Sequence, residues 1–222
     1  NVIIGNSGNN MLTGVGAYDQ LYGGAGDDVY YLNDGYSNVI EGINQGTDWI
    51  VANGYNAGPT IRLPDNVENL EIYFPAYFYT NTYVYGNELD NIIRGPTDGA
   101  GELGTVTLDG DLGADILIGG WGNTVYVVDN PGDQIIHTQG VATVESSISY
   151  VLGGNFWALT LTGQAAISGT GTVYGNRLDG TRNSAAHARS LQRCSSRAKS
   201  RGRCPGPGYT AWRSAGTCGP RQ

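Results

Sequence analysis

Single large apolar residues recur every nine positions in two parts of the chain, each after a run of glycine and small polar residues. The first array covers residues 5–31 as three tandem nonapeptides, and the second covers residues 110–127 as two. Their shared pattern is G-G-x-G-x-D-x-U-x, where U is large and apolar. The last three positions, x-U-x, are typical of a short strand whose central side chain points inward. The spacing therefore predicts short strands at nine-residue intervals, and no helical periodicity persists in residues 1–180.

The glycine-rich half of each nonapeptide predicts a tight turn. Glycine accepts positive φ, so the first six residues can turn with their carbonyl groups directed outward. Two nonapeptides complete one coil, which stacks units i and i+2 on the same edge. The expected fold is therefore all-β, a parallel β-roll or β-solenoid.

A longer repeat contains the nonapeptides. Residues 33–40 line up with residues 129–136, so that His137 takes the place of Glu41. The repeat is about ten nonapeptides long, and we expect two solenoid copies at 1–90 and 91–180. With two nonapeptides in every coil, the two copies predict ten coils.

The sixth position of the nonapeptide predicts cation sites, because turns two units apart can share an ion between them. Carbonyl and carboxylate oxygens are hard ligands that suit Ca²⁺. The pairs that the spacing predicts are Asn10 with Asp28, Asp19 with Ser37, and Asp115 with Asp133. The turn residues expected to complete these sites are Gly23, Gly24, Gly26, Gly110 and Gly113. The alternative, that these are ordinary surface-turn aspartates, is disfavoured by the in-register arrays. On the opposite edge Val106 would face Thr124, and neither supplies a carboxylate.

These residues resemble the repeats-in-toxin (RTX) family of secreted bacterial proteins. Asp19, Asp28 and Asp115 match the aspartate of its motif, residues 23–26 match its glycines, and residues 66–72 resemble its linker strands. The resemblance implies a calcium-loaded parallel β-roll and export by a type I system. Members of the family include extracellular proteases, lipases, epimerases, toxins, adhesins and surface-layer proteins, so the resemblance implies no single activity.

The charge distribution separates a body from a tail. Residues 1–180 hold all 20 acidic residues and only three arginines, a net charge of −17, whereas residues 181–222 hold nine basic residues, no acidic ones and all three cysteines. An acidic body disfavours nucleic-acid binding, and no apolar run approaches the ~18 residues of a membrane helix.

For the tail we expect a frameshifted or non-homologous segment, with a basic segment that binds an anionic surface as the alternative. The chain starts at Asn1 without an apolar signal segment, and we expect it to be part of a larger or processed polypeptide.

No catalytic signature is visible. The sequence contains no H-E-x-x-H motif, no G-x-S-x-G elbow and no cysteine with a plausible histidine partner. We therefore expect a non-enzymatic, secreted, calcium-binding structural solenoid of a surface layer, adhesin or extracellular assembly. The alternatives are the calcium module of a secreted hydrolase, lipase, protease or epimerase, and a carbohydrate-binding module.

Aromatic side chains are dense in residues 73–79, and the second copy lacks them at the corresponding place. Tyr77, Phe78 and Tyr79 are therefore expected to form a contact surface for another copy of the chain or for a cell-surface polysaccharide. Local packing over the coil is the other interpretation. Three consecutive rings in a strand cannot all point inward.

Overall fold

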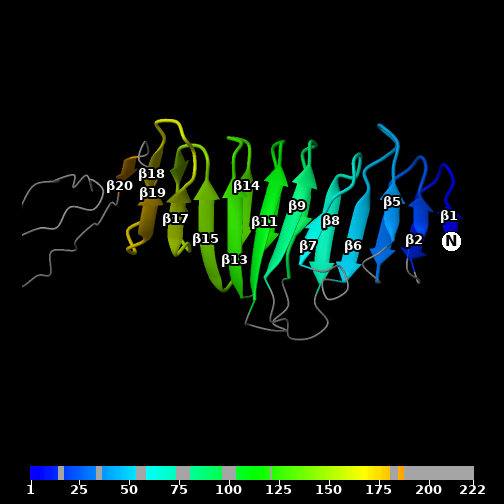
Figure 1. Ribbon diagram of the computed structural model, residues 1–222, viewed down its shortest axis with the longest axis horizontal. Helices are drawn as coiled ribbons and strands as arrows, with labels where there is room; N and C mark the ends of the chain where they lie inside the picture. Colours follow the sequence, from blue (N-terminus) through cyan, green and yellow to red (C-terminus); the bar gives the residue numbers. More distant parts are fainter. Residues whose placement is uncertain are drawn as a thin grey trace, which may run out of the picture. The chain divides into compact units, whose positions relative to one another are not determined.

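The computed structural model describes residues 1–14, 18–33, 37–53, 59–73, 81–96, 104–120, 122–180 and 185–187. In these ranges the fold consists of short strands that pair in parallel, and no helix occurs among them (Figure 1). The predicted all-β parallel solenoid is therefore confirmed. No helix with the length and apolarity needed to span a lipid bilayer occurs among the described residues.

The chain forms two compact units, Asn1–Thr143 and Val144–Gln222. This division does not coincide with the boundary between the two sequence copies near residue 90. The copies are defined by repeated sequence rather than by compactness, so the two-copy interpretation stays a prediction.

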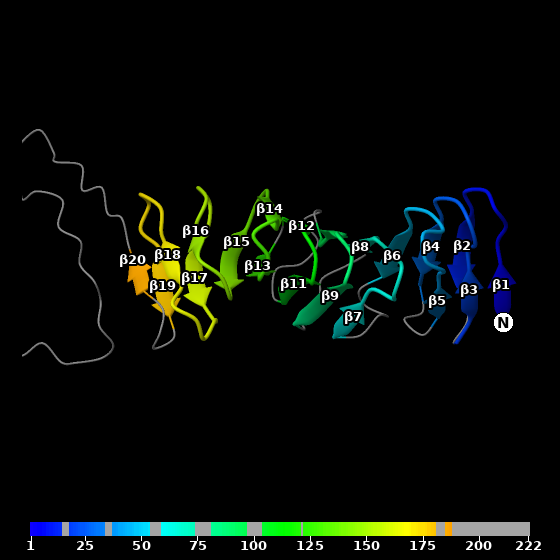
Figure 2. The ribbon, with the colours of Figure 1, turned by 90° about the horizontal axis from the view of Figure 1, so that it is seen from above.

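In the first unit, consecutive strands alternate between two layers, which Figure 2 shows from above. One layer is a seven-stranded sheet that contains every second strand: β2 (Met11–Gly14), β4 (Val29–Leu32), β6 (Trp49–Asn53), β8 (Asn69–Tyr73), β10 (Ile92–Arg94), β12 (Ile116–Gly119) and β14 (Gln134–His137). The other layer begins with a three-stranded sheet of β1 (Val2–Ile4), β3 (Gln20–Tyr22) and β5 (Asn38–Ile40). It continues with β7 (Thr60–Arg62), β9 (Thr82–Asn87), β11 (Thr105–Asp111) and β13 (Asn123–Val128).

Strand β15 (Val141–Ser146) contains the boundary between the units. The second unit repeats the parallel pairing on a smaller scale. Its strands are β16 (Tyr150–Val151), β17 (Ala158–Leu161), β18 (Ser168–Thr170), β19 (Arg177–Gly180) and β20 (Ala185–His187). In it β17 pairs with β19, and β18 pairs with both β16 and β20.

The coil length changes along the first unit. Within each array one coil equals two nonapeptides, since Met11 pairs with Val29 and Ile116 pairs with Gln134. Between the arrays the coil is longer, because Val29 pairs with Trp49, and Ile92 pairs with Ile116. The prediction of a constant coil of two nonapeptides, and of ten coils, is therefore wrong. Within the first unit, the 18-residue coil occurs at the glycine nonapeptides.

The core consists of apolar side chains that the strands of both layers direct between the layers. The eighth residues of the five nonapeptides are Leu12, Leu21, Tyr30, Leu117 and Tyr126, and all of them are buried. Neighbouring strand residues alternate between buried and partly exposed, as expected when one side of each strand faces the core. The inward direction of position U is therefore confirmed.

Candidate metal centre

A ladder of acidic and amide side chains follows one edge of the seven-stranded sheet of the first unit. Each member is the residue directly before a strand of that sheet. The members, in chain order, are Asn10, Asp28, Asp48, Glu68, Asn91, Asp115 and Asp133. We call this set the carboxylate ladder.

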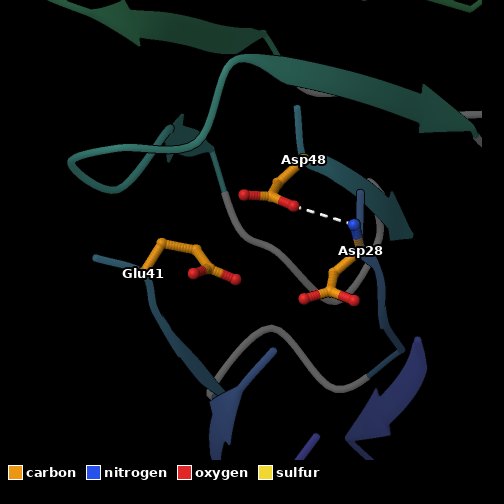
Figure 3. A group of neighbouring side chains, drawn as sticks. All are labelled: Asp28, Glu41 and Asp48. Carbon is orange, nitrogen blue, oxygen red and sulfur yellow. Dashed lines mark hydrogen bonds between the residues drawn. The ribbon is translucent and has the colours of Figure 1, made fainter. Parts of the chain in front are cut away.

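Backbone hydrogen bonds connect successive members of the ladder. The N–H of Asn10 donates to Asp28 Oδ1 at 2.6 Å, and the N–H of Asp28 donates to Asp48 Oδ1 at 2.8 Å, the bond drawn in Figure 3. In the second array the N–H of Asp115 donates to Asp133 Oδ1 at 3.1 Å. The structure thus brings together the two pairs that the nonapeptide spacing predicts on this edge. Their role as metal ligands stays a prediction.

Among the described residues, two aspartates of the ladder have a carboxylate oxygen without a hydrogen-bond partner. Asp28 and Asp115 are at most 1% exposed, and within the described residues no hydrogen bond reaches the Oδ2 atom of either. Buried polar atoms are normally paired, since an unpaired one loses its hydration without compensation. Each of these oxygens can therefore accept a further ligand.

The ladder partners of these two aspartates, Asn10 and Asp133, accept hydrogen bonds from backbone N–H groups of their own turns. Asn10 Oδ1 accepts a hydrogen bond from the N–H of Asn6 at 2.6 Å. Asp133 Oδ2 accepts from the N–H of Asn130 at 3.0 Å. The predicted pairs are therefore unequal: in each, one aspartate has an available oxygen and its partner is held by its own turn.

The predicted glycines have two different structural roles. Gly23 and Gly110 make room for the carboxylate, because a Cβ atom would lie 2.1 Å from Asp28 Oδ2 at Gly23 and 1.9 Å from Asp115 Oδ2 at Gly110. The other predicted glycines form the turn itself, and their φ angles of 94°, 110° and 119° are rarely adopted by other residues. They are Gly24, Gly26 and Gly113.

Burial and nearby negative charges raise the pKa of two carboxyl groups of the ladder. Burial raises the pKa of Asp115 to about 7, and the charge of Asp133 acts in the same direction. Burial likewise raises the pKa of Asp48 to about 7, with the charges of Glu41 and Glu68 adding to the effect. The folded chain thus resists ionisation of these groups when nothing positive is near them.

On the opposite edge, Asp19 is 1% exposed and accepts hydrogen bonds at 2.8 Å from both the backbone N and Nδ2 of Asn1, in the preceding coil. Asp19 thus joins its coil to the preceding one, and a cation shared with Ser37 stays a prediction. Val106 and Thr124 pair in register and are buried, as the spacing predicts.

Sequence reasoning missed Asp48, Glu68 and Asn91 as members of the ladder. They lie 20, 20 and 23 residues after the preceding member, outside the spacing of two nonapeptides. The available signal was a polar residue directly before a strand-like apolar run, as in Asp48 before residues 49–51. The predicted contact surface of Tyr77, Phe78 and Tyr79 lies outside the described residues.

Comparison with known proteins gives a similarity over part of the chain. No family model matches the chain, and no solved structure matches it. The chain is 35% identical over 92 residues to the endo-1,3-1,4-beta-glycanase ExsH of Rhizobium meliloti (strain 1021). The match covers 41% of this chain and spans only 18% of that protein.

Proposed function

We propose that the chain is a calcium-binding β-solenoid of the RTX type, which serves an extracellular protein as a structural element. The observation that carries the proposal is the pair of buried, unpartnered carboxylate oxygens of Asp28 and Asp115 in a ladder that crosses successive coils. A hard cation at such an oxygen would neutralise charge and join neighbouring coils. The partial similarity to the glycanase ExsH supports a role in a protein that acts at a polysaccharide.

The proposed site in the second array is tested by Asp115→Asn. The amide keeps an oxygen for the N–H of Asn91, which donates to Asp115 Oδ1 at 2.8 Å, but it removes the negative charge. We expect calcium affinity at this site to fall at least tenfold, a loss of about 1.4 kcal/mol or more. Isothermal titration of the full chain measures the change.

Thr124→Ala is the control for this substitution, because Thr124 pairs with Val106 on the opposite edge and neither residue supplies a carboxylate. It is expected to leave calcium affinity unchanged. Equal losses of affinity from both substitutions would show that the assignment of the site to the carboxylate ladder is wrong.

The raised pKa values of Asp48 and Asp115 predict an inverted pH dependence without calcium. A carboxyl group whose pKa is higher in the folded than in the unfolded chain stabilises the fold below its unfolded value, and this stability is lost as pH rises through the folded value of about 7. In chelator, the chain is therefore expected to melt at a higher temperature at pH 5 than at pH 8.

Saturating calcium is expected to reverse that order, since protons compete with the cation for the same oxygens. Thermal denaturation at both pH values, in chelator and in calcium, gives the four melting temperatures. A chelated chain that is more stable at pH 8 than at pH 5 would contradict the proposal that ionised buried carboxylates destabilise the calcium-free fold.

A second candidate function is a module of a secreted enzyme that acts on a polysaccharide, and the similarity to part of a glycanase favours it. Affinity electrophoresis in a mixed-linkage β-glucan gel separates the candidates. Retardation by the glucan would favour the glycan-associated module. Unretarded migration of the calcium-loaded chain would favour the purely structural role.

A further inference from the structure

A tyrosine and a glutamate meet inside the first coils of the first unit, and only the tyrosine belongs to a nonapeptide. Tyr30 is fully buried, and its hydroxyl donates a short hydrogen bond to Glu41 Oε1. Glu41 directly follows β5 and is only 8% exposed. The nonapeptide pattern contains no acidic residue at this place, so Glu41 is not part of the predicted turn sites.

Three carboxylates converge at this point. One oxygen each from Asp28, Glu41 and Asp48 lies within 4.8 Å of the others, and all three residues are buried. Figure 3 shows the three side chains directed toward a shared space, each from a different stretch of the chain. We call them the inner triad.

The unpartnered oxygen of Asp28 is directed into this space. A Cβ atom placed on Gly23 would lie 2.1 Å from Asp28 Oδ2, 2.2 Å from the Tyr30 hydroxyl and 2.6 Å from Glu41 Oε1. Three oxygens thus surround one point that only a glycine leaves open. The carboxylate of Asp28 is 0% exposed, so water from bulk solvent does not satisfy it.

The first unit has almost no positive charge to offset the inner triad. The only lysine or arginine residues in residues 1–143 are Arg62 and Arg94. Arg62 forms an ion pair with Asp111, and Arg94 forms one with Glu71 at 3.5 Å. Within the first unit, no lysine or arginine is left to compensate three buried carboxylates, so bound protons or a cation can take this role.

The second sequence copy builds the same arrangement without acidic residues. There Thr124 replaces Asp28, Tyr126 replaces Tyr30 and His137 replaces Glu41. A Cβ atom on Gly119 would lie 2.2 Å from the Tyr126 hydroxyl and 2.9 Å from Thr124 Cγ2, which reproduces the packing at Gly23. The Tyr126 hydroxyl lies 3.0 Å from His137 Nδ1. A coil of this kind therefore closes without a carboxylate, and the acidic residues of the first copy need another explanation.

We propose that Asp28, Glu41 and Asp48 hold one divalent cation of the Ca²⁺ type inside the first coils, with Glu41 as a ligand that the nonapeptide repeat does not supply. The inference deepens the proposed calcium-binding function and rests on it. Carboxylate oxygens are hard donors, and they bind Ca²⁺ in preference to softer metal ions. The second copy has a tyrosine–histidine hydrogen bond at the matching place, so the inner site is expected in the first copy and not in the second.

The test is Glu41→Gln in the full chain, titrated with Ca²⁺ by calorimetry and with Tb³⁺ by luminescence excited through tyrosine. Glutamine keeps the size of the side chain and removes the charge. We expect the loss of one bound ion per chain, or at least a tenfold weaker affinity for it, and lower Tb³⁺ emission, because Tyr30 lies beside the site. His137→Gln, at the matching position, is the control and should change neither readout.

Glu41→His is the second variant, because the second copy already folds with histidine at this place. It should keep the strand spectrum and still lose the ion. Unchanged stoichiometry and affinity in a folded Glu41→Gln or Glu41→His variant would overturn the inner site, while calcium bound at Asp115 would leave the proposed function intact. A wild-type chain that binds no calcium would overturn both.

Discussion

Removal of calcium is expected to abolish most of the strand signal of this protein, and millimolar Ca²⁺ is expected to restore it. Residues 1–180 carry a net charge of −17, and buried carboxylates follow one edge of the sheet. Without a cation these groups repel one another and resist ionisation. Each site adds about 2.7 kcal/mol when calcium is present at about 100 times its dissociation constant, so a few sites decide whether a marginal fold persists.

Far-ultraviolet circular dichroism of the full chain at neutral pH, in chelator and across a calcium titration, measures this change. Potassium at equal ionic strength is the control, because it screens charge without binding strongly to carboxylate sites. A strand spectrum that is the same in chelator and in calcium would contradict the proposed calcium-dependent fold.

Gly110→Ala is expected to destabilise the second array by about 2 kcal/mol or more, because forced overpacking costs about 1–3 kcal/mol. It is also expected to weaken the proposed calcium site at Asp115. The new methyl group would lie 1.9 Å from Asp115 Oδ2 and 2.2 Å from Asp115 Cγ, so the carboxylate must leave its place. Its hydrogen bond from Asn91 and its alignment in the ladder would be lost with it.

Gly154→Ala is the matched control. A Cβ atom at Gly154 has no described atom within 4 Å, and its φ lies outside the left-handed region. The same chemical change there should shift stability by no more than about 0.5 kcal/mol. Thermal denaturation in saturating calcium compares the two variants, and equal melting temperatures for them would refute the close-approach role of Gly110.

The solenoid and its two arrays were predictable because their information is local. The nine-residue period decides which side chain of a strand turns inward, so Leu21 and Tyr30 could be assigned to the core from the sequence alone. A spacing of two nonapeptides decides which turns stack, so the pairing of Asp115 with Asp133 followed directly. Neither inference needs long-range packing.

The members of the ladder between the arrays could not be found in the same way. Once the coil becomes longer than two nonapeptides, a search at the nonapeptide spacing passes over Asp48, although its carboxylate accepts a hydrogen bond from Asp28. The lengthened coils lack the glycine pattern that signals a turn. Their register is decided by which apolar strand residues pair in the sheet, such as Val29 with Trp49.

By itself, the amino-acid sequence determined the all-β class, the inward side chains of the nonapeptides and the acidic character of the body, because these depend on spacing and composition. Only the tertiary structure decided that Glu41 lies against Tyr30 and beside Asp28. Those residues are separated in the chain by more than one nonapeptide, and they meet because the coil closes between its two layers. The physical reason is that a solenoid makes contacts both along the chain and between coils, and local spacing predicts only those that repeat at a constant interval.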